Sequence, residues 1–542
     1  MRNTRRSTAA LLTALGTTAA LGFSLLSPAA TASLPAPQEQ LTPAAAPEPS
    51  AEEAADAALS AVQAEVAEAT AGEDAPGSAD DPARDLTLLL TDLATHLDDL
   101  GPAERRTAHQ YLARPSDAGG DNLGGGLIVK YPDGAPVRNS CSTDVCVNWV
   151  ETGKHRPSLT DSDDNDVPDY ADTMRTTMQD VWDFEVDDLG YKAPPPDTRG
   201  ANDKADVYIA EIGDDALYGY CIPETQVGSA WAFTSYCVLD DDYAADEFPT
   251  NTPLENLQAT AAHEFFHAIQ YGYDAGEDSW LTEGTAAWME DEAYDDVDDN
   301  RQYLSSSPLS HPGRPLDHSA SIGIYGSWIW WRYLSETFGN EVVRDIWDRA
   351  DDSANPAGNR YSMKAVTNEL ASRGTSVRAV FGRFGSDNRA PAHFYEEGAA
   401  YPSAPFAKRF NLTSANRTSG SRVLELDHMS HGTIQVKPGA GFGSSWELIV
   451  TVDAPPRLRH QPFAHVVVYD GDAPVGQSTI ALNKAGEGST SVPFGSDEVT
   501  RVDLTLTNAG RAYQCWKGTQ YSCLGRPLDD NLDFRYRVTA RP

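Results

Sequence analysis

The chain has 542 residues, a length that supports two or three domains with cores of their own. Its 81 acidic residues outnumber its 41 basic residues, which gives a formal net charge of −40. A surface this acidic repels nucleic acids and anionic membranes, so the composition argues against both as partners and is typical of a protein that stays dissolved outside the cell.

The first 32 residues have the pattern of a secretory signal peptide. Three arginines stand within the first six residues, an apolar run follows, and Ala30, Thr31 and Ala32 supply small residues before a cut. No later apolar run is long enough to cross a membrane. We therefore expect a secreted, extracellular protein without membrane insertion, and we expect it to be a monomer.

Residues 33–120 are predicted to form a low-complexity stretch followed by a helical pro-segment. Residues 33–84 are rich in Ala, Pro and Glu, which gives them no core of their own. Residues 86–112 differ, because leucines recur there at helical spacing and Pro102 opens a second helix. Such a pair of helices must pack on something. We predict a removable cover, which makes the chain a zymogen; the alternative is a permanent helical part of the mature protein.

Strands and one helix are expected in the next part of the chain. Alternating or continuous apolar residues predict strands at residues 127–131, 145–150, 206–211 and 228–239. Between the second and third of these, residues 170–189 predict a helix. This mixture of strands and helices predicts an α+β domain.

Six cysteines form three pairs that are close in the sequence, Cys141 with Cys146, Cys221 with Cys237, and Cys515 with Cys523. In an exported chain, an even number of cysteines at short spacing indicates disulfides, and we expect each cysteine to pair with its neighbour. A cysteine-ligated metal or a thiol nucleophile is the alternative, although no C-x-x-C sequence supports it.

An acidic stretch at residues 161–172 has oxygen-bearing groups at calcium-loop spacing. The expected ligands stand at relative positions 1, 3, 5, 7, 9 and 12, and they are Asp161, Asp163, Asn165, Val167 (through its carbonyl), Asp169 and Asp172. Asp166 replaces the usual Gly, so the stretch resembles dockerin-type D-x-D-x-N repeats more than an EF-hand. We predict a structural Ca²⁺ site, with a solvated acidic turn as the alternative.

The strongest chemical signal is the H-E-x-x-H sequence formed by His263, Glu264 and His267. No Pro or Gly interrupts residues 254–271, which predicts a helix with a stop at Gly272. Positions i and i+4 lie one above the other on a helix, so both imidazoles can reach one metal ion. Glu264 can then act on the water that the metal carries, which is the signature of a zinc peptidase.

Catalytic zinc keeps three protein ligands and one open position, so a third ligand is needed. The longer H-E-x-x-H-x-x-G-x-x-H pattern fails, because Tyr273 stands at the place of its last histidine. Residues 280–288 form an apolar helical segment that contains one carboxylate, Glu283. A glutamate on a second helix completes a His-His-Glu site. Less favoured third ligands follow it in the sequence, namely Glu290, Asp291 and Glu292.

The sequences HEFFHAIQYGYD and WLTEGTAAWMED together resemble those of gluzincin-type zinc metallopeptidases. More closely, they are similar to those of a family of secreted bacterial metalloproteases with a C-terminal β domain. The resemblance implies zinc on His263, His267 and Glu283, with Glu264 as the catalytic base. It covers residues 127–350 strongly and the C-terminal β domain only in character. The gap from His267 to Glu283 is shorter than in thermolysin.

The resemblance also implies an oxyanion donor. Residues 324–334, followed by a Phe-Gly pair, are similar to the helix that follows the glutamate ligand in many gluzincins. In that family a tyrosine hydroxyl donates to the oxyanion of the tetrahedral intermediate. Tyr325 would carry this role, although the tyrosine-to-helix spacing departs from the family pattern by one residue. A packed core tyrosine is the alternative.

A substrate-binding strand is the last feature that the resemblance implies. In metallopeptidases of this type, the strand before the zinc helix edges the cleft and pairs with an extended substrate. The residues at this place are Ala230, Trp231, Ala232 and Phe233, which would bind peptide backbone by strand addition. A plain core strand is the alternative.

The C-terminal part changes in texture after two further helical stretches, at residues 342–350 and 365–384. From residue 401 onward, strands separated by Gly, Asn and Pro turns predict an all-β sandwich. The predicted strands are residues 423–426, 434–436, 446–452, 464–469, 502–507 and 534–538. No catalytic cluster occurs among them, so we expect an accessory domain.

These observations predict a zincin-like α+β metallopeptidase domain at residues 121–400 and a β-sandwich at residues 401–542. The expected function is secreted hydrolysis of a protein or peptide substrate by a zinc-activated water, with Glu264 as general base. An endopeptidase is favoured over an aminopeptidase, because no G-x-M-E-N-like segment precedes the zinc helix. The alternative is a calcium-stabilised surface- or matrix-binding protein with a non-catalytic zinc site.

Overall fold

The computed structural model describes residues 50–70, 86–117, 128–197, 199, 202–228, 231–320, 322–351 and 362–542. All of these belong to the unit formed by residues 48–542. The signal peptide expected at residues 1–32 lies outside the described residues. Within the described ranges, no helix combines the length and the apolar character that crossing a membrane requires.

A five-stranded mixed sheet organises the N-terminal half, with the strand order β1-β2-β3-β5-β4. Strands β2, β3 and β5 run parallel to one another, whereas the outer strands β1 and β4 are antiparallel to their neighbours. The strands are β1 (Val137–Cys141), β2 (Val145–Val150), β3 (Ala205–Ala210), β4 (Gly219–Gln226) and β5 (Phe233–Asp240). β4 therefore offers the open edge nearest the later helices.

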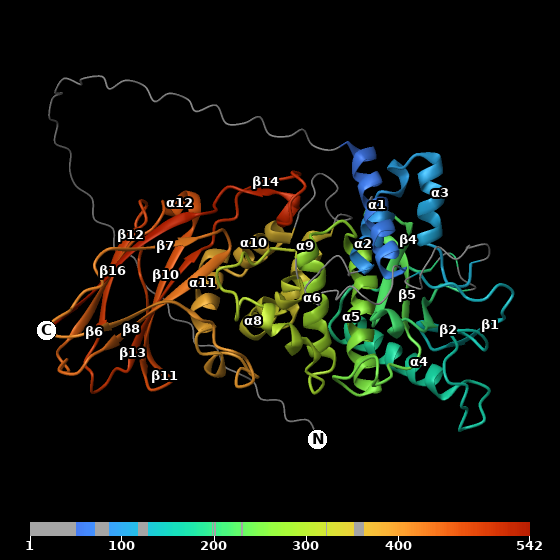
Figure 1. Ribbon diagram of the computed structural model, residues 1–542, viewed down its shortest axis with the longest axis horizontal. Helices are drawn as coiled ribbons and strands as arrows, with labels where there is room; N and C mark the ends of the chain where they lie inside the picture. Colours follow the sequence, from blue (N-terminus) through green and yellow to red (C-terminus); the bar gives the residue numbers. More distant parts are fainter. Residues whose placement is uncertain are drawn as a thin grey trace. The chain divides into compact units, whose positions relative to one another are not determined.

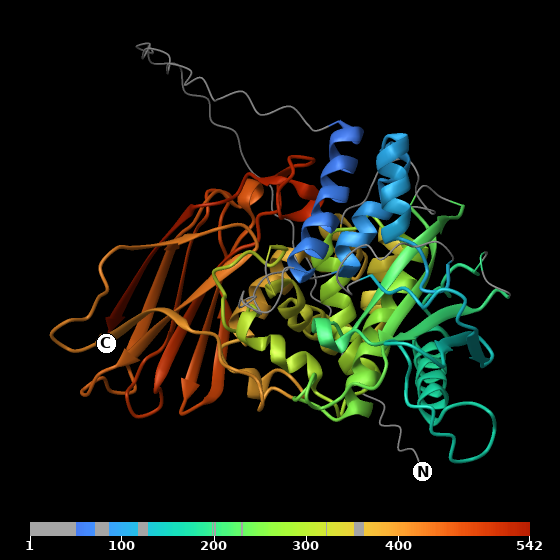
Figure 2. The same cartoon turned by 45° about the vertical axis from the view of Figure 1, so that its right-hand side comes forward.

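Helices cover both faces of this sheet (Figures 1 and 2). One face packs against α1 (Ala51–Thr70), α2 (Leu86–Thr95) and α3 (Pro102–Tyr111), in a core that includes Tyr220 and Val238. The other face packs against α4 (Asp169–Trp182) and α5 (Pro253–Tyr273), in a core that includes Val207 and Leu239. The alternation of side chains along each strand supplies both apolar faces.

Further helices extend the core around α5. They are α6 (Ser279–Ala293), α7 (Gly323–Gly326), α8 (Trp328–Phe338), α9 (Glu341–Ala350), α10 (Ser362–Ser372) and α11 (Val377–Asp387). Gly284 lets α6 and α8 approach closely, because a Cβ at that position would collide with the side chains of Ser327 and Trp331. Trp280 stacks on Trp331 across the same contact, with 5.2 Å between ring centroids.

Two C-terminal sheets share one apolar core. The first has the order β11-β10-β13-β8-β6 and the second the order β12-β9-β16-β7. Their strands are β6 (Phe406–Leu412), β7 (Arg422–Leu426), β8 (Ser430–Pro438), β9 (Glu447–Asp453), β10 (Pro462–Asp470), β11 (Ala473–Thr479), β12 (Glu487–Pro493), β13 (Arg501–Asn508) and β16 (Leu532–Arg541). A two-stranded ribbon, β14 (Tyr513–Gln514) with β15 (Arg526–Pro527), lies outside both sheets.

The predicted α+β composition with C-terminal β sheets is confirmed, as are the three nearest-neighbour disulfides. Some elements differ from expectation. Residues 128–131 form no strand, and β4 was not predicted. The helix α5 continues past Gly272 to Tyr273, because the φ angle of this glycine is helical. The expected helix at residues 365–384 is divided between α10 and α11, and Gly374, with φ +77°, lies in the break.

Candidate metal centre

The helix α5 is fixed at its start by local sequence. Thr252 caps it: its side chain accepts the backbone N–H of Glu255, and the Glu255 carboxylate accepts the N–H of Thr252. Pro253 at the first helical position suits a helix start, because the amide hydrogen it lacks would have no partner there. This capping box fixes where the helix begins. Because His263 and His267 stand four residues apart on this helix, they lie on one face of it.

His263, His267 and Glu283 come together in the structure as a candidate metal centre. Nε2 of His263 lies 3.2 Å from Oε2 of Glu283, and Nε2 of His267 lies 3.5 Å from Oε1 of the same carboxylate. The two helices α5 and α6 thus present two imidazole nitrogens and two carboxylate oxygens to one point. Glu283 has no exposed surface, and His267 is 1% exposed.

The donor set and its spacing fit a zinc ion. Ligand atoms about 2.0–2.1 Å from a tetrahedral ion lie about 3.3–3.4 Å apart, and the two observed separations fall on either side of that value. Nε2 of His267 and Oε1 of Glu283 are buried and have no hydrogen-bond partner among the described residues. Buried polar atoms are costly when unpaired, so their convergence is what a metal centre requires.

The remaining nitrogen of each imidazole is held by a supporting side chain. Nδ1 of His263 lies 2.7 Å from Oε1 of Glu290, and Nδ1 of His267 lies 2.8 Å from Oε1 of Gln270. Gln270 is itself fixed, because its Nε2 donates to the carbonyl of Thr282. Such contacts leave Nε2 as the metal-facing nitrogen of both rings. Sequence analysis named Glu290 only as a weaker third ligand and missed Gln270.

Electrostatics in the cluster follow from burial and mutual contact. Burial opposes ionisation of Glu283, but His267 and His263 outweigh it and lower the pKa of Glu283. Burial raises the pKa of Glu264, against the opposite effect of His267 and His263. A raised pKa lies closer to neutral pH, and a general base is most effective when its pKa is near the working pH.

A cleft of about 170 Å³ opens beside the cluster. Its lining includes His263, Glu264, Glu290 and Tyr325. The ring of Tyr325 lies 6.0 Å from that of His263 and stacks on Tyr303 at 4.9 Å. Tyr325 therefore lies on the cleft wall, and its role as an oxyanion donor stays a prediction.

The helix α2, which lies beside β4 (Figure 1), contributes Leu86 and Thr87 to the lining of the same cleft. Its Thr87 donates to the carboxylate of Glu264 at 3.4 Å and accepts the backbone N–H of Cys221 at 3.3 Å. One turn further, Thr91 shares a hydrogen bond with the hydroxyl of Tyr271, which donates to the carbonyl of Cys221. The helix thus occupies the outer edge of β4 and touches the expected catalytic base.

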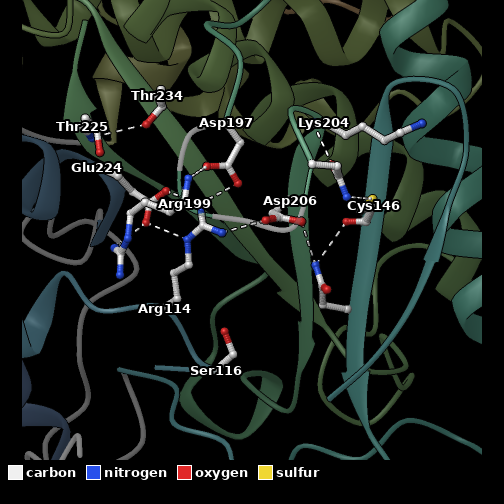
Figure 3. Close-up of polar contacts among 12 residues, drawn as sticks. Arg114, Ser116, Cys146, Asp197, Arg199, Lys204, Asp206, Glu224, Thr225 and Thr234 are labelled. Atoms are coloured by element: carbon white, nitrogen blue, oxygen red, sulfur yellow. Dashed lines mark hydrogen bonds and ion pairs between the residues drawn. The ribbon is translucent and has the colours of Figure 1, made fainter. Parts of the chain in front are cut away.

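A buried arginine holds the chain after α3 to the sheet (Figure 3). Arg114 is 3% exposed, and its guanidinium donates to Asp206 at 2.7 Å and to Asp197 at 2.9 Å. It also pairs with Glu224 on β4 through two nitrogens, one of them Nε at 2.7 Å. The segment that carries α1–α3 is therefore joined to the sheet by ion pairs as well as by apolar packing.

Of the four residues expected to bind substrate, three are described by the structure, and of these only Phe233 lies in a strand. Ala230 lies outside the described residues, Trp231 and Ala232 precede β5, and Phe233 begins it as a buried residue. β5 lies between β3 and β4, so it has no open edge along most of its length. The edge strand beside the cleft is β4, whose outer side is contacted by α2. The GYCIPETQ sequence of β4 contains Pro and lacks regular alternation, which explains why it was missed.

The expected calcium loop folds into a network of turns. Asp161 accepts the backbone N–H groups of Asn165 and Asp166, and Asp169 accepts that of Ser162. Oxygens of Asp161, Asp163 and Asp169 lie within 4.8 Å of one another, whereas Asn165 donates to Asp172. The backbone N–H of Val167 donates to the Asn165 side chain. Three of the six predicted ligands thus converge, and the assignment to Ca²⁺ stays a prediction.

Comparisons with known proteins find one family model that matches part of the chain, and its description gives no function. A family model described as a family of unknown function, DUF6055, matches residues 129–370, which include the whole candidate centre and amount to less than half of the chain. No curated protein matches the sequence.

Three solved structures show weak similarity. The pre-peptidase C-terminal domain of a collagenase from Bacillus anthracis is 10% identical, with 25% of this chain and 97% of that chain covered and a TM-score of 0.15. PliG from Aeromonas hydrophila, a periplasmic inhibitor of g-type lysozyme, is 12% identical, with 25% and 100% covered and a TM-score of 0.14. A GH115 4-O-methyl-α-glucuronidase, BtGH115A, is 8% identical, with 53% and 38% covered and a TM-score of 0.15. Scores this low support no argument about fold or function.

Proposed function

We propose that the chain is a secreted zinc metallopeptidase of gluzincin type, with a zincin-like catalytic part and an accessory β-sandwich. The observation that carries this proposal is the convergence of His263, His267 and Glu283, in which the buried Nε2 of His267 and Oε1 of Glu283 lie 3.5 Å apart without a hydrogen-bond partner among the described residues. The H-E-x-x-H sequence and the supporting contacts of Glu290 and Gln270 add to it.

In this proposal His263, His267 and Glu283 hold the ion. Bound zinc supplies Lewis-acid polarisation of a peptide carbonyl and acidifies a water molecule. Glu264 would accept a proton from the attacking water and would pass it to the leaving amine. Tyr325, on the cleft wall, donates to the developing oxyanion. The substrate is a protein or peptide, and the open edge of β4 is where an extended chain would pair.

We further propose that α1–α3 cover the centre in a latent precursor. The contact of Thr87 with Glu264 and its hold on the N–H of Cys221 support this, because both places are needed by a substrate. Since α1–α3 share a core with the sheet, the alternative of a permanent helical part stays open. Sequencing the N-terminus of the secreted protein separates the two: a start beyond residue 120 supports removal, and a start near Ser33 contradicts it.

The decisive experiment measures zinc content by mass spectrometry together with casein hydrolysis, for the secreted wild type and for Glu264→Gln. We expect about one zinc per chain in both proteins, chelator-sensitive hydrolysis by the wild type, and a loss on the order of 10²–10⁴-fold in the variant. Equal hydrolysis by the variant would contradict the catalytic role of Glu264. Zinc without hydrolysis in either mature protein would favour the surface-binding alternative.

A further inference from the structure

Six carboxylates from three segments meet beneath one wall of the cleft. Glu211 follows β3, Asp214 lies in the 3₁₀ turn η4 (Gly213–Asp215), three aspartates stand at and after the end of β5, and Glu247 precedes α5. Side-chain oxygens lie within 4.8 Å of one another in three groups, which are Glu211 with Asp240 and Asp241, Glu211 with Asp214 and Glu247, and Asp240 with Asp242 and Glu247.

Asp240 fixes the base of this carboxylate cluster. It has no exposed surface, and its carboxylate accepts four backbone N–H groups. These belong to Ile212, Gly213, Asp242 and Tyr243. The turn after β3 and the turn after β5 are therefore held in place, and the other carboxylates of the cluster are brought together by them.

Asp241 is the member of the cluster that the protein leaves unsatisfied. It is 7% exposed and points into the group formed with Glu211 and Asp240, yet no described residue donates a hydrogen bond to its carboxylate or pairs with it. Oε2 of Glu247 is likewise buried without a hydrogen-bond partner among the described residues. Lys154 lies at the rim, 3.7 Å from Asp214, rather than beside Asp241. A buried carboxylate in this state calls for a cation.

The titration behaviour agrees with that geometry. Burial, together with the neighbouring charges of Asp240 and Glu211, raises the pKa of Asp241 to about 8. Burial and Glu211 act in the same direction on Glu247. Without a bound cation, the cluster must therefore hold protons near neutral pH.

We propose that this cluster is a calcium site, with Asp241 and Glu211 as direct ligands above the charge of Asp240. The donors are carboxylate oxygens alone, which favour a hard cation over zinc, and Ca²⁺ accepts six to eight oxygens at variable angles, whereas Mg²⁺ demands a regular octahedron. Three carboxylates close to one another, with more beside them, match the larger and more flexible coordination shell.

The carboxylate cluster is connected by hydrogen bonds to one wall of the cleft. Ile212, held by Asp240, accepts the N–H of Leu217 through its carbonyl, and the N–H of Asp240 donates to the carbonyl of Tyr218. Leu217 and Tyr218 both line the cleft beside the candidate zinc centre. A cation that neutralises Asp241 would therefore keep this wall in place, from the side opposite to any substrate.

The test uses the secreted, zinc-loaded full chain and follows CaCl₂ binding by titration calorimetry. Asp241→Asn keeps the shape of the side chain and removes its charge, and Glu211→Gln does the same at the second ligand. We expect wild-type binding with a dissociation constant on the order of 10⁻⁴ M or tighter, and at least about tenfold weaker binding in either variant. Asp163→Asn, in the separate loop at residues 161–172, is the matched control and should retain this binding event.

Hydrogen exchange supplies a local second readout. Calcium should protect the amides of residues 206–220 in the wild type and in Asp163→Asn, but not in Asp241→Asn. In calcium-free buffer Asp241→Asn should unfold at the same or a higher temperature than the wild type, because the variant no longer has to bind a proton to avoid a buried charge. Unchanged calcium binding in both cluster variants would overturn the proposal, and an equal response to MgCl₂ would overturn the choice of calcium. Neither readout depends on peptide hydrolysis.

Discussion

Two buried charged clusters in this protein differ in how completely their polar atoms are paired. Around Arg114, each guanidinium nitrogen donates to Asp197, Asp206 or Glu224. Around Glu283, one imidazole nitrogen of His267 and one carboxylate oxygen are buried without a hydrogen-bond partner among the described residues and face each other at 3.5 Å. Burial and charge alone do not separate the two clusters, whereas the unpaired atoms do.

The difference teaches how a structural cluster and a candidate centre can be told apart. A satisfied network joins distant parts of a chain and needs nothing further. A cluster whose free atoms converge on one point is incomplete without an ion. The carboxylates around Asp241 belong to the second kind, since Asp241 is buried and its carboxylate is unpaired among the described residues. The following variants test whether the two kinds of cluster differ in this way.

The largest effect is expected from Glu283→Gln. The variant loses a charged ligand of the candidate centre, so zinc content should fall from about one per chain towards zero and hydrolysis should fall to background. The matched control is Glu292→Gln on the same helix, since Glu292 pairs with Arg332 and not with the histidines. Zinc retained in full by Glu283→Gln would remove the difference between the two clusters.

Arg114→Met should lower the free energy of unfolding by about 3–5 kcal/mol, because it leaves buried carboxylates without their cation. Denaturant unfolding of the full chain measures this. The control is Arg138→Met, whose pair with Glu151 is exposed, with an expected loss of about 0–1 kcal/mol. A similar loss in both variants would show that the Arg114 network is not the structural cluster described above.

His428 gives a pH-dependent version of the satisfied cluster. Burial lowers its pKa, but Asp317 and Asp530 outweigh burial and raise it from 6.5 to about 10. The stabilisation by the protonated ring is therefore full below about pH 6.5 and is lost as the pH rises towards 10. The thermal unfolding temperature of the wild type should fall as the pH rises through this interval, and that of His428→Gln should fall less.

His431 is the control for that measurement. It is buried without hydrogen-bond partners for its ring nitrogens among the described residues, and burial lowers its pKa to about 3. The ring is therefore neutral throughout the alkaline interval, and His431→Gln should keep the alkaline loss of stability. If the loss disappears in His431→Gln and persists in His428→Gln, the assignment to the pair of His428 with Asp317 is wrong.

The smallest effect is expected from Gln270→Leu. This change removes the hydrogen bond to Nδ1 of His267 while keeping the ligands, and it should weaken zinc binding about 10–100-fold. Competition with a zinc chelator measures the affinity. Gln179→Leu, on α4 and away from the centre, should bind zinc as the wild type does. Equal affinities in the two variants would mean that Gln270 does not orient the ring.

Much of the secondary structure and the core of the candidate centre were accessible from the sequence. Helical spacing predicted α5 and α6, and strong apolar patterns predicted β2, β3 and six of the C-terminal strands. Gln270 could have been found as well, because it stands three residues after His267 on the same helix. The edge strand β4 could not, since its residues lack an alternating pattern and its place depends on pairing with β5.

The sequence by itself determined that His263 and His267 can face one metal ion, because an i, i+4 pair on a helix needs no distant partner to share one face. Only the tertiary structure decided what surrounds that centre. The contact of Thr87 with Glu264 joins residues 177 positions apart, and the carboxylates of Glu211, Asp241 and Glu247 meet through turns at the ends of different elements. Such contacts depend on how the sheet and helices pack, and no local spacing encodes them.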